Sequence, residues 1–228
     1  FYLVDESRTI YASPESGAPL YVSRTRNIGG LPRESIQNNL NAPTGNFDLV
    51  TMIYKIRQSD GAGSFSIYEG DRAYNVSFQS AGIEKIKTDA GEYETSLINV
   101  QCDYFAEIGI RDFRVNVSSD EARLPVAVRF RAAKGEFRAR LASVQNLEPQ
   151  ADPLPTPAPI GTPRPTPAPT PTPRSYVENQ PLPQDLSFEL GETLEYRIST
   201  GGQPVATFVL QAGARKQVDG ADSLLLTA

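Results

Sequence analysis

Residues 125–141 read PVAVRFRAAKGEFRARL, and this stretch decides the fold class. Apolar and basic side chains alternate on both sides of a Lys-Gly pair, a pattern typical of two strands with one buried and one solvated face. Gly135 can supply the positive φ that a tight turn requires. We therefore predict an antiparallel hairpin, whose inner side chains are Val126, Val128, Phe130, Phe137, Ala139 and Leu141.

Strand signals of the same kind recur on both sides of this hairpin, in segments rich in β-branched and aromatic residues. Before it, the predicted strands include Ile10–Tyr11, Leu20–Ser23, Ser64–Tyr68, Ala73–Ser80, Tyr93–Phe105 and Phe113–Val117. Near the end of the chain they are Leu186–Glu189, Thr193–Ser199 and Ala206–Gln211, with a turn at Gly201–Gly202. The sequence thus predicts an all-β, mainly antiparallel fold, built as a curved sheet or half-barrel.

One short helix interrupts the strand pattern at residues 48–57, DLVTMIYKIR. Its apolar residues at 49, 52, 53 and 56 have helical spacing. Asp48 is a suitable N-cap, because its carboxylate can accept the free amides of the first turn. We expect this amphipathic helix to lie against the sheet.

A proline-rich segment occupies residues 149–183 and holds thirteen of the nineteen prolines, many alternating with Thr or Ala. Proline fixes φ and removes a backbone donor, so we predict a disordered linker of polyproline II type that could span roughly 100 Å. Docking into a proline-binding domain is the alternative, but the monotonous repeat favours a spacer. The expected organisation is a β domain at 1–148, this linker, and a β-hairpin within 184–228.

Composition excludes several function classes. The net charge of −5 and the lack of a basic segment argue against nucleic acid as a partner. With one cysteine and no histidine, zinc is improbable and we expect no cofactor. No apolar run is long enough for a transmembrane helix. The chain starts without Met and stops at Ala228 inside an apolar run, so we expect a fragment of a longer protein.

Candidate catalytic residues each have a stronger structural explanation. Asp120 and Glu121 are adjacent carboxylates, but they fit a turn that Asp120 caps while Arg123 pairs locally. Cys102 has no histidine to act as its base, so we expect it to pack as a small apolar residue. No G-x-S-x-G elbow or phosphate-binding glycine loop is present. Carboxylates at 60, 69 and 71 fit no known calcium loop. We expect no enzyme activity.

Four arginines form a predicted stripe on the outer face of the hairpin, Arg129, Arg131, Arg138 and Arg140. Such a stripe could meet anionic lipid headgroups or acidic glycans. A solvated face that keeps the hairpin soluble is the interpretation we favour.

Three stretches resemble the family named domain of unknown function 3108 (DUF3108), which occurs in exported bacterial proteins. They are the helix at 48–57, the hairpin region GDRAYNVSFQSAGIEKIKTDAGEYET at 70–95, and FRVNVSSDEARLPVAVRFRAAKGEFRARL at 113–141, whose signature runs from Ser119 to Val126. Asn116 stands where the family often has Trp, and we expect it to be an exposed strand residue.

Residues 186–228 resemble the start of the same family, with Gly191, Glu192, Leu194 and Tyr196 on its opening motif. The resemblance implies a tandem: a first copy without its opening strands, the linker, and the start of a second copy. The C-terminal strands could then fill the vacant edge of the first copy's sheet by strand addition.

The resemblance also implies a periplasmic or cell-envelope location and no assigned activity. We expect a non-enzymatic module that binds an apolar or amphipathic ligand, or a partner protein of the envelope, in the curved sheet. The alternatives are a structural spacer without a small ligand, and an enzyme whose site lies outside this sequence.

Overall fold

The computed structural model describes residues 4–13, 18–28, 31–38, 46–69, 72–146, 189–218 and 221–228. Strands dominate these residues, and two short helices accompany them. In chain order the elements are β1 (Val4–Ala12), β2 (Pro19–Ile28), β3 (Leu31–Asn38), β4 (Asn46–Phe47), α1 (Leu49–Gln58), β5 (Ala62–Glu69), β6 (Arg72–Thr88), β7 (Gly91–Cys102), α2 (Asp103–Glu107), β8 (Arg111–Ser118), β9 (Pro125–Ala132), β10 (Gly135–Asn146), β11 (Glu192–Thr200), β12 (Gln203–Val218) and β13 (Ala221–Thr227).

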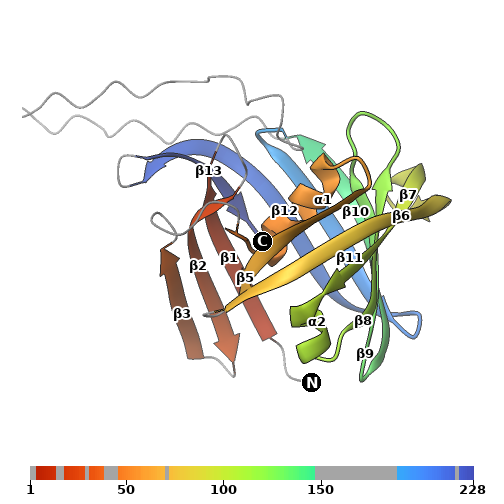
Figure 1. Cartoon of the computed structure of the whole chain (residues 1–228), viewed down its shortest axis with the longest axis horizontal. Helices are drawn as coiled ribbons and strands as arrows, with labels where there is room; N and C mark the ends of the chain where they lie inside the picture. Colours follow the sequence, from red (N-terminus) through yellow and green to blue (C-terminus); the bar gives the residue numbers. More distant parts are fainter. Residues whose placement is uncertain are drawn as a thin grey trace, which may run out of the picture.

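Within the described residues, thirteen strands form one open sheet in the order β3-β2-β1-β13-β12-β11-β10-β9-β8-β7-β6-β5-β4. Neighbouring strands are antiparallel, except that the two-residue β4 runs parallel to β5. Figure 1 shows the strands arranged around α1, and we call the side of the sheet that faces α1 the concave face. The expected all-β fold is confirmed.

The C-terminal strands belong to the same sheet as the N-terminal strands. β11 pairs with β10 from Glu192↔Asn146 to Thr200↔Phe137, and β13 pairs with β1 from Leu224↔Ala12 to Thr227↔Thr9. Figure 1 shows these blue strands lying between β10 and β1. The expected pairing of the C-terminal strands with the first sheet is therefore confirmed, but these strands lie inside the sheet, between β10 and β1, rather than at its edge. The division into two family copies stays a prediction from sequence. The linker predicted at 149–183 lies outside the described residues.

The hairpin that decided the fold class forms with the predicted register. Phe137 lies opposite Phe130, and Ala139 lies opposite Val128, so the apolar side chains share one face. Gly135 has a φ of 123°, a value that L side chains rarely adopt, as its place in the tight turn requires. The alternation of apolar and basic residues was sufficient to predict both strands.

The helix α1 begins one residue after its predicted cap. The Asp48 carboxylate accepts hydrogen bonds from the backbone amides of Val50 (3.1 Å) and Thr51 (2.7 Å). Thr51 in turn accepts a hydrogen bond from the Asp48 amide (2.8 Å), which completes a reciprocal cap. The predicted helix and its N-cap are confirmed.

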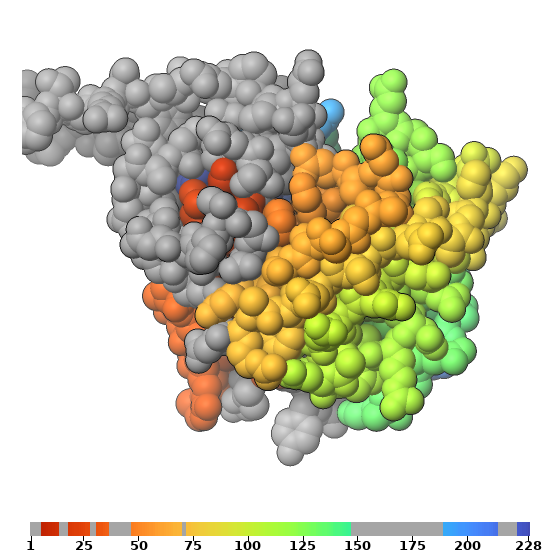
Figure 2. Space-filling view, viewed as in Figure 1, coloured from red at the N-terminus to blue at the C-terminus, as the bar shows by residue number. Residues whose placement is uncertain are grey.

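The two halves of the sheet bury α1 from two sides. Val50 and Tyr54 pack in one core cluster with side chains of β1, β11 and β13, including Ile10, Leu194 and Leu226. Met52 and Ile56 pack in a second cluster with side chains of β5, β6 and β8, including Ile67, Val76 and Val115. The helix is therefore buried more widely than the apolar stripe at 49, 52, 53 and 56 predicted. In Figure 2, α1 and β5 form one continuous surface on the visible face.

The predicted strand Tyr93–Phe105 is wrong at its end, because β7 stops at Cys102 and α2 follows. The helical turn brings Phe105 against Phe113, with ring centroids 4.5 Å apart. Burial of this aromatic pair accounts for a change of chain direction that strand propensity did not show.

Among the described residues, no helix is both long enough and apolar enough to span a membrane.

Candidate functional site

The C-terminal end of α1 is held by a buried ion pair. The Arg57 guanidinium donates to both carboxylate oxygens of Glu192, the first residue of β11, at 2.5 and 2.7 Å. It also donates to the Ala122 carbonyl at 2.8 and 3.2 Å. The two side chains are only 3% and 9% exposed. A bidentate pair of this kind fixes orientation as well as distance, so it ties the helix to a strand far away in sequence.

The turn between β8 and β9 also binds the C-terminal end of α1. Arg123 donates to the carbonyls of Arg57 (2.7 Å) and Ser59 (2.6 Å), groups that the end of a helix leaves without intrahelical partners. Asp120 accepts from Ser118 (2.6 Å) and from the Arg123 amide (3.2 Å). The predicted turn cap is confirmed, but the Arg123 guanidinium reaches the helix rather than a neighbouring carboxylate.

A tyrosine of β11 completes this arrangement. The Tyr196 hydroxyl donates to the Pro125 carbonyl at 2.8 Å. Burial raises the pKa of Tyr196 well above its usual value. Burial also raises the pKa of Tyr54, and the nearby Glu192 carboxylate raises it further. Both phenols are therefore neutral at ordinary pH. We call Arg57, Asp120, Arg123, Glu192 and Tyr196 the α1 clamp.

The α1 clamp joins three stretches that the sequence analysis singled out separately. Arg57 ends the helix motif, Asp120 and Arg123 lie in the signature before β9, and Glu192 and Tyr196 lie in the opening motif of the C-terminal strands. These contacts do not follow from the sequence, because the spacing of the residues along the chain carries no sign of contact. Arg57 and Glu192 are charged residues at buried positions, and charges in predominantly apolar motifs were the signal that could have pointed to the clamp.

The N-terminal end of α1 meets a second group of charges on the concave face. Arg8 lies 2.7 Å from Glu69 and 3.5 Å from the capping residue Asp48. Glu6 lies 2.8 Å from Arg24 and 3.7 Å from Arg26. We call Glu6, Arg8, Arg24, Arg26 and Glu69 the charged cluster. It links β1 and β2 to β5, so the two halves of the sheet make polar contact here.

Two groups of the charged cluster have shifted pKa values. Burial alone would raise the pKa of Glu6, but the hydrogen bond and charge of Arg24, with the charge of Arg8, outweigh burial and lower it. Burial would lower the pKa of Arg8, but the carboxylates of Glu69 and Asp48 outweigh burial and raise it. The cluster therefore stabilises its own ionised state.

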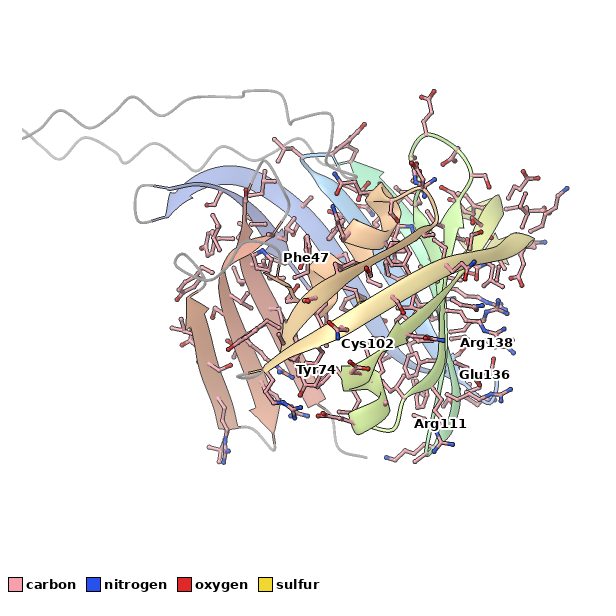
Figure 3. The ribbon with its side chains drawn as sticks, in the orientation of Figure 1. Phe47, Tyr74, Cys102, Arg111, Glu136 and Arg138 are labelled. Atoms are coloured by element: carbon pink, nitrogen blue, oxygen red, sulfur yellow. The ribbon has the colours of Figure 1, made fainter. Side chains whose placement is uncertain are left out.

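Six aromatic rings follow one another from β6 through α2 to β10, and we call them the aromatic ladder. Its successive rings are Tyr74, Tyr104, Phe105, Phe113, Phe130 and Phe137, with centroids 5.2, 6.4, 4.5, 6.0 and 5.3 Å apart. Tyr74 and Phe105 are buried, whereas the other four rings are only partly buried. The last three rings are nearly parallel, with interplanar angles of 15° and 12°. Figure 3 shows Tyr74 beside α2.

The charged cluster adjoins the aromatic ladder at Tyr104. Burial raises the pKa of Tyr104, Glu69 raises it further, and Arg24 lowers it, so the phenol lies within electrostatic reach of both charges. Phe130 and Phe137 were predicted on the inner face, and the structure confirms this, because Phe130 stacks on Phe113 beside the second core cluster. The ladder as a whole was not predicted, because the other rings come from elements that are distant in sequence.

The arginine stripe on the outer face is largely paired with carboxylates. Arg129 lies 2.9 Å from Glu84, Arg131 lies 3.4 Å from Asp112, and Arg138 lies 2.6 Å from Glu136. Figure 3 shows Glu136 and Arg138 projecting away from α1. These pairs reduce the cationic character of the stripe and support the interpretation as a solvated face.

Asn116 is fully buried, so the expectation of an exposed strand residue is wrong. Its amide donates to Thr95 (3.0 Å) and Glu84 (3.2 Å). The physical reason is the long β6–β7 hairpin, whose tip reaches β10 and β11. There the Ala90 amide donates to the Leu141 carbonyl at 3.4 Å, and Asp89 pairs with Arg197.

The remaining candidates from the sequence do not assemble into a reactive site. Cys102 is a buried free thiol, and burial raises its pKa. Of the three carboxylates weighed for calcium, Glu69 is occupied by Arg8, Asp60 is exposed, and Asp71 lies outside the described residues. Over the described part of the chain, no group of three or more Cys, Asp or Glu side chains could hold a metal ion.

The buried ion pair of the α1 clamp leads to a prediction about the free energy of unfolding. Removing one charge of the pair should lower it far more than replacing both charges with apolar side chains. Arg57→Met should lower the free energy of unfolding by about 3–5 kcal/mol, because Glu192 stays buried without its partner. Arg57→Met combined with Glu192→Leu should recover most of this loss in urea unfolding. Arg138→Met, which breaks an exposed pair, is the control and should cost less than about 1 kcal/mol. A single-variant cost no larger than the control would contradict the buried pair.

The lowered pKa of Glu6 predicts a pH-dependent contribution to stability. Because the folded pKa lies below the unfolded value of about 4.3, ionised Glu6 stabilises the fold above that value. This stabilisation is lost as the pH falls through the folded pKa. Glu6→Gln should therefore be destabilising at pH 7, and its difference from the parent should shrink between about pH 5 and pH 3. Glu121→Gln, an exposed control, should show no such trend; equal trends would count against the charged cluster.

The comparisons with known proteins agree with the resemblance of the motifs. The model of the family described as protein of unknown function (DUF3108) matches residues 5–142. Among curated proteins and among solved structures, nothing matches this chain. The matched region carries α1, the signature turn with Asp120 and Arg123, and the β9–β10 hairpin, and it covers more than half of the chain. The chain belongs to the DUF3108 family of proteins of unknown function.

Proposed function

We propose that this protein is a non-catalytic binding module. An amphipathic ligand binds to the concave face of its sheet, beside α2, the short helix between β7 and β8. The aromatic ladder carries this proposal, because four of its six rings keep part of their surface accessible. Partly exposed aromatic rings in a row offer apolar contact area together with a preferred stacking geometry. An extended apolar chain or a flat ring would gain the most from such a surface.

The charged cluster supplies the complementary half of an amphipathic site. Its most accessible members are Arg26 and Arg24, whose side chains are 47% and 32% exposed, whereas Glu69 is 7% exposed. Glu6 is 27% exposed and pairs with both arginines, so the accessible part of the cluster holds two arginines against one carboxylate. This part carries a net positive charge and adjoins the first rings of the aromatic ladder. Since a charged group near apolar surface orients a ligand, we commit to a ligand with an apolar chain and an anionic head.

The state of the other side chains supports a non-catalytic role. The Cys102 thiol has a raised pKa and lies in the core, whereas a nucleophilic cysteine needs the thiolate and an accessible position. Two carboxylates beside the aromatic ladder have structural partners: Glu69 pairs with Arg8, and Glu107 accepts a hydrogen bond from Tyr74. Structural pairing accounts for these charges.

A structural role in the cell envelope is the second candidate. One observation favours it: α1 fills part of the concave face, and the two core clusters close around the helix. A sheet whose interior is packed in this way needs no ligand to be stable. Ligand binding separates the two candidates, because only the first requires the partly exposed rings.

Titration calorimetry with dodecanoate, kept below its micelle concentration, provides the test. The parent chain should bind it, and Phe130→Ala should weaken binding about tenfold, or about 1.4 kcal/mol, by removing one ring from the aromatic ladder. Arg24→Gln should weaken the binding of dodecanoate but should leave the binding of the uncharged dodecyl maltoside unchanged. Ile83→Ala removes an exposed apolar side chain outside the ladder and serves as the control. No binding by the parent chain would overturn the proposal and favour the structural role.

We also propose that the protein works in the bacterial periplasm or cell envelope. The family resemblance stated for its motifs supports this location. Antibody detection in fractionated cells of the host should find the protein in the periplasmic or envelope fraction. Recovery in the cytoplasmic fraction alone would contradict the proposed location and would leave the ligand-binding test unaffected.

A further inference from the structure

β11–β13 form a unit that occupies a defined place within the sheet, and we call it the C-terminal strand unit. One side of the unit pairs with β10 and the other side pairs with β1. Backbone hydrogen bonds between Arg8 and Ala228, at 2.8 and 2.9 Å, extend the second junction. Without this unit, β10 and β1 would each present an unpaired edge, and such edges readily accept strands from another chain.

The place between β10 and β1 recognises the C-terminal strand unit through side chains as well as backbone. Glu192 meets the buried Arg57, and Tyr196 meets the Pro125 carbonyl. Leu194, Leu210 and Leu224 of the unit are at most 2% exposed in the cluster that surrounds Val50 and Tyr54 of α1. The unit therefore fits this place by charge, hydrogen bonding and apolar packing together.

The connection to the unit is far longer than the geometry needs. Asn146, the last residue of β10, lies directly opposite Glu192, the first residue of β11. Two to five residues can join antiparallel neighbours of this kind. The chain instead uses residues 147–191, and thirteen prolines lie within 149–183. A connection of this length lowers the effective concentration of the unit at its own sheet, compared with a short turn.

We propose that the C-terminal strand unit of one copy of this chain enters the place between β10 and β1 of a second copy. The same hydrogen bonds, ion pair and apolar contacts form in the exchanged state, so the exchange sacrifices no interface. Reciprocal exchange between two copies closes a symmetric dimer. The balance between the closed monomer and this dimer is set by protein concentration against the effective concentration that the connection allows.

Cross-linking of two variants of the full chain, each with one added cysteine, tests the exchange. Arg140 and Arg197 are exposed and lie directly opposite each other on β10 and β11. Chains carrying Arg140→Cys and chains carrying Arg197→Cys are mixed, unfolded, refolded together and then oxidised, while Cys102 stays buried. Exchange predicts a disulfide-linked heterodimer whose yield rises with the protein concentration during refolding. The control mixes Arg140→Cys with Ile83→Cys, and a yield no higher than in this control would overturn the proposal.

Light scattering on the unmodified chain gives an independent measurement that does not depend on the cysteine variants. Refolding at high concentration should produce a dimer, and deletion of residues 150–187 should reduce the dimer fraction about tenfold, because a short connection holds the unit beside its own β10. A monomer at every concentration would overturn the proposal. Equal dimer fractions with and without the deletion would overturn it as well, because the dimer would then form by another surface.

Discussion

The buried ion pair between Arg57 and Glu192 is the interaction on which the arrangement of this sheet depends. It connects the helix inside the concave face with the first residue of the C-terminal strands. A buried pair is a weak source of stability when it is compared with apolar residues of similar size, because both charges lose their hydration. The pair acts instead on the arrangement of the elements. Burying either charge without its partner would cost free energy, so the fold is stable only when α1 and β11 are packed together.

The hydrogen bonds around this pair bring three distant stretches of the chain into one neighbourhood. Arg57 and Arg123 each donate to a backbone carbonyl of the other's segment, and this ties the helix end to the turn before β9. Tyr196 then ties β11 to the start of β9. Residues that sequence reasoning weighed for acid–base chemistry, above all Asp120, take part in positioning. In this chain the segment from Ser119 to Val126 therefore serves to hold the end of the helix.

The parts of the fold that were predictable from sequence are those decided by local pattern. Alternation over residues 125–141 was sufficient for the β9–β10 hairpin, and Asp48 with its following apolar residues was sufficient for α1. The burial of Asn116 was not predicted. The residue pattern around Asn116 cannot reveal that the β6–β7 hairpin covers the outer face of β8 at this position. The aromatic ladder and the partner of Arg57 were missed for the same physical reason: both depend on elements that only tertiary packing brings together.

The ion pair also bears on strand register, which matters where strands join across a long connection. Glu192, Leu194 and Tyr196 alternate along β11, and all three are buried at the concave face. A slip of one residue against β10 would turn all three to the outer face and leave Arg57 buried without a carboxylate. An apolar contact at this position would tolerate such a slip more readily than a bidentate ion pair does. A unit joined by so long a connection receives little guidance from the chain, so its register is specified by this contact and by the leucines beside it.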